Sequence, residues 1–254
     1  MCPVLFHLGG FTVYAYGFFL ALGFAVGLGL AVLKARREGI SFERIIELFF
    51  YTVFSAILGS RILFVLINVD LYRQHPSQIL NLGEGGLVFY GGLVLAIGVA
   101  MVYMRWHRLP IWKCADLFSP YIALGLFFGR IGCFFAGCCY GQETSLPWGI
   151  IFTDPDSLAR LNVRLHPTQL YDAVNGLAIF FFLKWMERRK TFDGQILWLF
   201  LLLYSITRFF IEMVRDDPRG FFFGGLLSTS QGAGILLAIL SSFMLFYLKG
   251  RGGK

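Results

Sequence analysis

Apolar runs long enough to cross a lipid bilayer recur along this chain, and they constrain its fold more than any other feature. A spanning helix needs about 20 mostly apolar residues, because its backbone polar groups can be satisfied only within the segment. Only 15% of the residues are charged, against about 25% in a soluble domain. The sequence predicts an all-α integral membrane protein, a single polytopic domain over residues 1–254, with about seven transmembrane helices at Tyr14–Leu33, Ile45–Ile67, Leu87–Met104, Ala115–Phe128, Leu170–Trp185, Gln195–Met213 and Leu226–Leu248.

Lysine and arginine in the connecting segments predict the orientation of these helices. Cytoplasmic loops carry an excess of both residues. The basic residues gather in every second connection and at the C-terminus, at Lys34, Arg36, Arg37, Arg44, Arg105, Arg108, Lys113, Lys184, Arg188, Arg189, Lys190, Lys249, Arg251 and Lys254. The N-terminus is therefore expected outside and the C-terminus inside. The net charge of +7 does not indicate nucleic-acid binding, because the charge is spread between apolar runs and not collected in one patch.

One connection, Gly129–Pro167, is long, faces outward in this topology and is rich in glycine, cysteine and polar residues. Loops of this length in a compact protein are usually functional or disordered. Its apolar residues Trp148, Ile150, Ile151 and Phe152 argue against disorder. We expect a small ordered periplasmic cap between the fourth and fifth helices.

Arginines within or beside the apolar runs are the first candidate functional residues. Arg61 lies in the second run, Arg130 ends the fourth, and Arg208 lies near the outer end of the sixth, four residues before Glu212. Ionisable groups inside a membrane are costly and mark function by default. A structural ion pair between Arg208 and Glu212 is the alternative. Since a guanidinium matches phosphate with a planar fork of donors, the set favours an anionic lipid headgroup as ligand.

Glycine and cysteine dominate the segment GRIGCFFAGCCYG at residues 129–141. Its glycines permit either close approach to a ligand or close packing of helices. The adjacent cysteines Cys138 and Cys139 are interpreted as small packing residues, with a disulfide from Cys133 as the alternative. No metal site is predicted, because the chain has no CxxC pair.

Two further segments open predicted helices. The segment HPTQLY at 166–171 could supply a functional His166, or His166 could be a capping or surface residue. The segment GGLVFYGG at 85–92 could be a flexible helix entry, with Tyr90 as an interfacial anchor.

Taken together, these segments resemble the prolipoprotein diacylglyceryl transferase family along nearly the whole chain. The motifs follow the family's order: FTVYAYG at 11–17, GLVFYGG at 86–92, GRIGCFFAGCCYG at 129–141, HPTQLY at 166–171, RFFIEMVR at 208–215 and LSTSQ at 227–231. Several ordered motifs are more specific than any one alone. The family's seven-helix architecture, with the N-terminus outside, agrees with the topology predicted from charge.

The resemblance implies transfer of the diacylglyceryl group of phosphatidylglycerol to the lipobox cysteine of a prolipoprotein signal peptide. It implies a thioether product, release of glycerol-1-phosphate, and a location in the bacterial cytoplasmic (inner) membrane among membrane lipid. No cofactor, metal or nucleic acid is expected. Two alternatives remain open: a family relative that binds lipid or lipoprotein without catalysis, and a carrier for an anion or lipid, against which the lack of an internal repeat argues.

The resemblance also implies roles for individual residues. The catalytic set is Arg130, Arg208, Tyr90, His166 and Glu212, in which Arg130 and Arg208 hold the phosphate and Glu212 orients Arg208. The substrate-binding set is Tyr16, Arg61, Gly91, Gly92, Gly129, Gly132, Cys133, Gly141 and Tyr171. Better-known members have His at the position of Tyr90, and Asn and Glu at those of Cys133 and Cys138. The general base therefore stays open between Tyr90, His166 and the phosphate itself, and we expect Tyr90 only to position the lipid.

Overall fold

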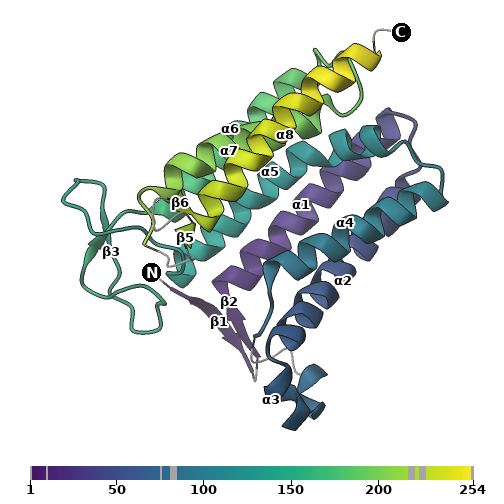
Figure 1. Ribbon diagram of the computed structural model, residues 1–254. Coiled ribbons are helices and arrows are strands. Elements are labelled where there is room, and N and C mark those ends of the chain that lie inside the picture. The colour runs from purple at the N-terminus through teal and green to yellow at the C-terminus, as the bar shows by residue number, and fades with distance from the viewer. Residues whose placement is uncertain are drawn as a thin grey trace. The chain divides into compact units, whose positions relative to one another are not determined.

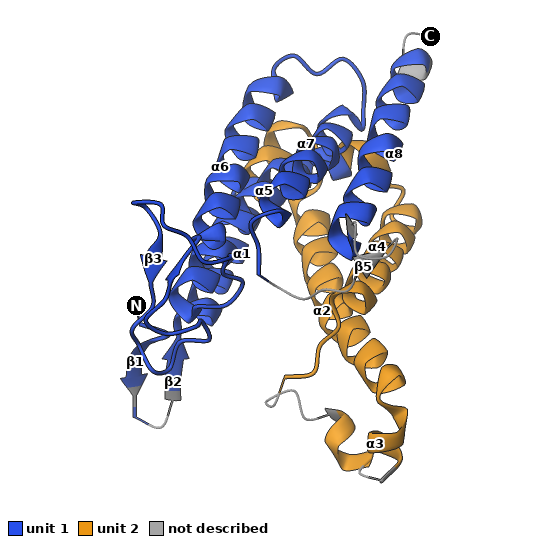
Figure 2. Cartoon of the chain, turned by 60° about the vertical axis from the view of Figure 1, so that its left-hand side comes forward, with its two compact units in different colours: residues 1–31, 115–254 blue, residues 32–114 orange. Residues whose placement is uncertain are grey.

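The computed structural model describes residues 2–9, 11–74, 76–80, 85–216, 221–222 and 227–252. The chain divides into two compact units, residues 1–31 with 115–254 and residues 32–114, which are coloured separately in Figure 2. Each unit is described by itself.

Unit 1 contains most of the chain. It begins with the antiparallel hairpin of β1 (Val4–Leu8) and β2 (Phe11–Tyr14), followed by the larger part of α1 (Ala15–Arg37). Its other elements, in chain order, are α5 (Ile111–Ala136, from residue 115 on), β3 (Ile150–Ile151), β4 (Arg164–Leu165), α6 (Thr168–Glu187), α7 (Gln195–Glu212), β5 (Phe221–Phe222), β6 (Leu227–Ser228) and α8 (Thr229–Gly252). Figure 1 shows α7 lying alongside α8 and α6.

Unit 2 consists mainly of two long antiparallel helices and a short helical connection. The long helices are α2 (Phe42–Ile67) and α4 (Phe89–Trp106), which pack along each other (Figure 1). The connection holds α3 (Val69–Gln74) and the 3-10 helix η1 (Pro76–Leu80).

The predicted membrane architecture is confirmed in its class. Six described helices are long and apolar enough to cross a bilayer: α1, α2, α4, α5, α7 and α8. Each corresponds to a predicted run, although the predicted start of the last one, Leu226, lies outside the described residues. The remaining run is also a helix, α6, but polar residues in its first turns, among them Gln169, Asp172 and Asn175, reduce its hydropathy. A total of seven spans therefore stays a prediction.

The exposed surface of these helices suits lipid. Large apolar side chains stay uncovered along their length, with Val94 on α4 and Phe246 on α8 exposed by 72% and 80%. Water disfavours apolar surface on this scale, whereas lipid tails do not. The protein is therefore a multi-pass membrane protein.

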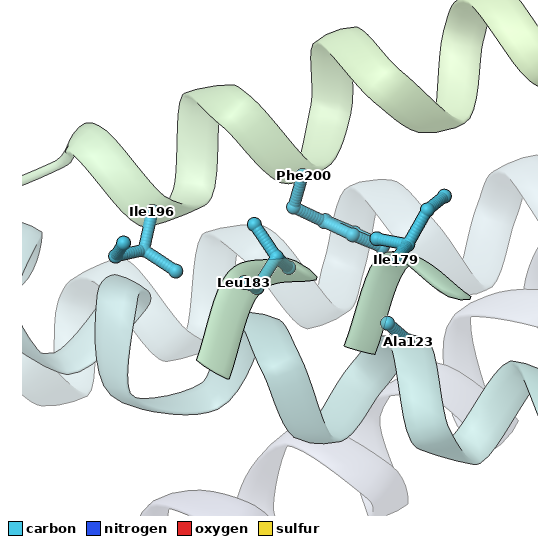
Figure 3. Packing of buried hydrophobic residues seen from close by; sticks show 5 residues of the cluster. All are labelled: Ala123, Ile179, Leu183, Ile196 and Phe200. Atoms are coloured by element: carbon cyan, nitrogen blue, oxygen red, sulfur yellow. The ribbon is translucent and has the colours of Figure 1, made fainter. Parts of the chain in front are cut away.

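A buried apolar cluster holds α5, α6 and α7 together in unit 1. Ala123 of α5 lies beside Ile179 and Leu183 of α6 and Ile196 and Phe200 of α7 (Figure 3). All five side chains are at most 6% exposed. The cluster fixes the register of the three helices, and they carry the charged residues described below.

One predicted boundary is wrong. Residues 129–136 were expected to begin the outer loop, but α5 continues through them to Ala136. The glycines do not end the helix. Gly132 instead serves packing against α1, since a Cβ there would lie 3.1 Å from the Tyr16 Cα. The loop proper, residues 137–167, is ordered by the β3–β4 pair and a small core of Phe152, Ala159 and Leu165. Its position on the periplasmic side stays a prediction.

The first turn of α7 is capped from another helix. The N-cap residue Gly194 has no side chain to accept the free N–H groups. Instead the buried carboxylate of Asp116 in α5 accepts from the Gly194 and Leu197 amides, at 2.7 and 2.9 Å. The Lys190 ammonium lies 2.9 Å from the same carboxylate. Asp116 thus sets where α7 begins.

Candidate functional site

Five charged side chains meet inside unit 1. Arg208 and Glu212 come from α7, Arg215 follows it, Arg130 comes from α5 and Asp172 from α6. The Asp172 Oδ2 atom lies 3.2 Å from Arg130 Nη2, 3.6 Å from Arg215 Nη1 and 3.8 Å from Arg208 Nη1. Glu212 pairs with Arg208 one helical turn away and lies 3.7 Å from Arg215 Nε. We call these five residues the arginine cluster.

The chain holds the arginine cluster in place through its local structure. Arg215 is fixed by a backbone bridge to Gly141, and the Gln142 amide donates to the Val214 carbonyl at 2.9 Å. Gly141 itself is closely packed, since a Cβ there would lie 2.5 Å from the Val214 carbonyl oxygen. The end of α7 is thereby tied to the loop that follows α5.

The arginine cluster is buried and carries an excess of positive charge. The exposed fraction of the Arg130 side chain is 16%, and that of the other four is 9% or less. Three guanidinium groups face two carboxylates, which leaves one net positive charge. The Arg208 Nη1 atom has no hydrogen-bond partner within the described part of the chain. A buried donor without an acceptor costs about 1–3 kcal/mol, so an anionic oxygen bound here would be stabilised.

The motif that opens α8 supports this cluster. Ser228 Oγ donates to Glu212 Oε1 at 3.4 Å. The Ser228 amide donates to the Gln231 side chain at 3.0 Å, while the Gln231 amide donates back to Ser228 Oγ at 3.1 Å. This reciprocal arrangement is a capping box. The LSTSQ segment therefore both starts α8 and contacts Glu212.

The predicted residues His166 and Tyr171 lie together just before and within the first turns of α6. His166 Nδ1 is 3.1 Å from the Tyr171 hydroxyl, which also accepts a hydrogen bond from Trp148 Nε1 at 2.9 Å. Both partners hold the Tyr171 ring in one orientation. Trp148 was not a candidate from the sequence.

A shallow groove runs beside these residues along α6 and α7. Its volume is about 430 Å³, and its walls are mostly apolar, with Tyr171 and Val174 on one side and Thr207, Phe210 and Val214 on the other. Residues two apart on a helix point about 200° apart, so Phe210 lies on a different face of α7 from Arg208 and Glu212. The groove therefore offers apolar surface on another face of the two helices that carry part of the arginine cluster.

Of the other predicted residues in unit 1, Tyr16 and Gly132 pack α1 against α5. A Cβ at Gly129 would meet no described atom within 4 Å. Cys133 lies near Cys138 and Cys139, and all three are free cysteines whose sulfur atoms lie within 4.8 Å of one another.

The remaining predicted residues belong to unit 2. Arg61 donates to the carbonyls of Gln78, Ile79, Gly85 and Gly86 at 2.7–3.1 Å, which favours a structural role in holding the α3–η1 connection.

Gly91 and Gly92 let α4 approach α2. A Cβ at the facing Gly59 would lie 2.5 Å from the Gly91 carbonyl oxygen. Helix packing therefore accounts for these glycines. Tyr90, in the first turn of α4, is 58% exposed.

Two members of the arginine cluster, Asp172 and Arg215, were missing from the predicted site. The signal for Asp172 was present, because it is an ionisable residue within a predicted span directly after Tyr171. Arg215 lies at the end of the RFFIEMVR motif, outside the predicted span, so the sequence did not indicate that it is buried.

Comparison with known proteins identifies the family. A family model described as prolipoprotein diacylglyceryl transferase matches residues 3–247. Proteins named phosphatidylglycerol–prolipoprotein diacylglyceryl transferase are similar along almost their whole length. One from Clostridium perfringens is 37% identical over 251 residues, which cover 98% of this chain and 96% of the relative. One from Clostridium tetani is 34% identical over 244 residues, or 96% of each chain. One from Pasteurella multocida is 32% identical over 258 residues, or 99% and 94%. The prediction from the motifs is confirmed, and the chain belongs to the prolipoprotein diacylglyceryl transferase family.

Proposed function

We propose that this transferase moves the diacylglyceryl group of phosphatidylglycerol to the lipobox cysteine thiol of a prolipoprotein signal peptide. The observation that carries the proposal is the buried arginine cluster, with its net positive charge and an Arg208 Nη1 atom that makes no hydrogen bond to the described residues. Phosphatidylglycerol brings an anionic phosphodiester to a membrane-embedded site, and arginine is suited to bind it.

The chemistry needs a negative charge stabilised on the leaving phosphate. The acceptor thiolate attacks the carbon of the diacylglyceryl group that is bonded to the phosphate oxygen. A C–S bond forms, and the C–O bond breaks with its electron pair leaving on glycerol-1-phosphate. Arg130 and Arg208 hold the phosphate oxygens, because fixed positive donors are most effective in a site that excludes water.

The two carboxylates orient these arginines. Asp172 contacts Arg130, Arg208 and Arg215, and Glu212 contacts Arg208 and Arg215. A guanidinium fixed in this way loses little conformational entropy on binding phosphate. Arg208 keeps hydrogen-bonding capacity for the ligand, since its Nη1 atom faces Asp172 Oδ2 at 3.8 Å but makes no hydrogen bond to the described residues.

The apolar groove along α6 and α7 suits one acyl chain of the lipid, on the same two helices that carry Asp172, Arg208 and Glu212. Tyr171, whose hydroxyl is hydrogen-bonded to His166 and Trp148, lies on the groove wall and limits where the acyl chain enters. In this arrangement His166 shapes the pocket. We further propose that the site opens to the outer face of the bacterial cytoplasmic membrane, with the N-terminus outside, and that both units act as one polytopic domain.

A reconstituted transfer assay tests the proposal. Purified protein, phosphatidylglycerol and a lipobox peptide are incubated, and the products are read by mass spectrometry. We expect the peptide to gain one diacylglyceryl group and glycerol phosphate to be released. Arg208→Ala should abolish transfer, while Arg188→Ala, at an exposed position after α6, should retain it.

Two results would contradict the proposal. Transfer that persists in a folded Arg208→Ala protein would remove the arginine cluster from the reaction. Binding of phosphatidylglycerol without any transfer, by wild-type protein offered several lipobox peptides, would identify a non-catalytic relative.

A further inference from the structure

Three thiols converge at the end of α5, in a chain whose sequence contains no CxxC pair. The Sγ atoms of Cys133, Cys138 and Cys139 all lie within 4.8 Å of one another. Cys133 is buried, the other two are partly buried, and all three are free. Plain packing does not require three thiols to face a common point.

The backbone turns sharply to bring them together. Gly137 and Cys139 both have positive φ angles, 75° and 61°. A left-handed conformation costs an L-residue roughly 1–2 kcal/mol, so Cys139 adopts it only because the surroundings enforce it. Side chains of adjacent residues point apart in an extended segment. The turn instead lets the neighbouring thiols of Cys138 and Cys139 face Cys133.

Hydrogen bonds from the first turn of α6 hold this turn in place. Gln169 Nε2 donates to the Cys138 carbonyl and Thr168 Oγ1 to the Cys139 carbonyl, both at 2.8 Å. Both donors are fully buried in the first turn of α6. The Cys138 amide donates to the Cys133 carbonyl at 3.2 Å. The Cys138 thiol also donates to the Cys133 carbonyl, at 3.8 Å. These bonds fix the turn, and the three sulfur atoms lie within 4.8 Å of one another.

We propose that Cys133, Cys138 and Cys139 form a three-thiolate site for a zinc-class cation. Soft thiolates select such metals, and zinc with three protein ligands keeps a fourth position open for water or a substrate. A disulfide between any two of the thiols would leave the third without a role. The expectation of no metal relied on linear spacing, which does not register a turn that folds Cys138 and Cys139 back onto α5.

The surrounding charge favours this site. Three thiolates around a divalent cation carry one net negative charge, and the positively charged Arg215 is bridged through its backbone to Gly141, two residues after Cys139. Arg215 also contacts Asp172 in the arginine cluster. Arg215 therefore belongs to the arginine cluster and is anchored to the segment that carries the proposed metal site.

Its consequence, which rests on the proposed function, is that the open fourth position receives the acceptor thiol. A thiol that coordinates zinc loses its proton, which passes to solvent. The coordinated sulfur then forms the C–S bond while the C–O bond to phosphate breaks. The oxidation state of the metal does not change. This arrangement supplies the activated nucleophile that His would otherwise be expected to provide at the position of Tyr90.

Metal binding is measured first, without reference to activity. Protein purified under reducing conditions is loaded with zinc, dialysed and analysed for bound metal, and cadmium loading is followed by thiolate-to-metal absorption in the ultraviolet. We expect about one ion per chain, since three thiolates hold a zinc ion whose fourth position stays open. Cys138→Ser and the triple Cys133→Ser, Cys138→Ser, Cys139→Ser protein should lose the bound ion. The control Cys2→Ser, at an exposed position distant in sequence from the three thiols, should keep it.

Three outcomes would overturn the site: no metal retained by reduced, folded protein, metal retained by the triple variant, or a mass lower by two hydrogen atoms, which reveals a disulfide. Transfer is then assayed with and without a chelator. We expect chelation to lower the rate by about 10²-fold, the usual scale for losing a proton-transfer group, and zinc to restore it. Transfer unaffected by metal removal would refute the metal's role and leave the proposed function intact. Metal bound without any transfer would refute the function and leave the site intact.

Discussion

Replacing Asp172 with asparagine tests the arginine cluster most directly, because Asp172→Asn removes one charge and preserves the shape of the side chain. Asp172 lies 3.2–3.8 Å from three guanidinium groups and is 3% exposed. Two unit charges 4 Å apart interact by roughly 4 kcal/mol at an effective dielectric constant of 20. Breaking a buried ion pair from one side costs about 3–5 kcal/mol. In a chain of this size that corresponds to a fall of roughly 6–20 °C in Tm.

Thermal unfolding in detergent measures this fall, with Asp193→Asn as the matched control. Asp193 pairs with Lys190 at 2.7 Å but is 56% exposed, so its removal should cost less than about 1 kcal/mol. Because Asp172→Asn raises the net charge of the cluster, phosphatidylglycerol should also raise the Tm of that variant more than that of the wild type. A fall in Tm no larger than that of Asp193→Asn would refute the reasoning.

Three further predictions concern other parts of the chain. Gly91→Ala should lower stability by about 1–3 kcal/mol, because the Cβ meets α2, whereas Gly98→Ala in the same helix meets no described atom and should be neutral or stabilising; chemical unfolding compares them. Tyr90→Phe should retain transfer in the reconstituted assay, and a total loss would make the hydroxyl essential. Burial acts to lower the pKa of Lys190, but its hydrogen bonds to Asp193 and Asp116 raise this pKa above its ordinary value. The stability from Lys190 is therefore complete below pH about 10 and is lost as the pH rises through the folded-state pKa. The Tm of Lys190→Gln should therefore fall less than that of the wild type as the pH rises above about 10. Equal falls in Tm for the two proteins would contradict this prediction.

The sequence alone predicted the architecture well, for a physical reason. A bilayer sets both the length and the polarity of a spanning helix, so local composition located α1, α2, α4, α5, α7 and α8. Ionisable residues inside such runs are rare enough to mark function, which identified Arg130 and Arg208 as candidates. The ordered motifs identified the family, because motif order is a property of the linear chain.

The sequence did not predict the contacts between helices, which only the tertiary structure shows. Asp172 joins Arg130 and Arg208 only because the packing of Ala123, Ile179 and Phe200 sets the register of three helices. Asp116 caps α7 from another helix, across a long stretch of chain.

The same holds for glycines and cysteines. Composition could not distinguish glycines that contact ligand from those, like Gly91, that contact another helix. It could not show that a left-handed Cys139 turns two adjacent thiols toward a third. Hydropathy and motifs depend on which residues follow one another, whereas charge pairing and ligand geometry depend on distances that only the folded chain establishes.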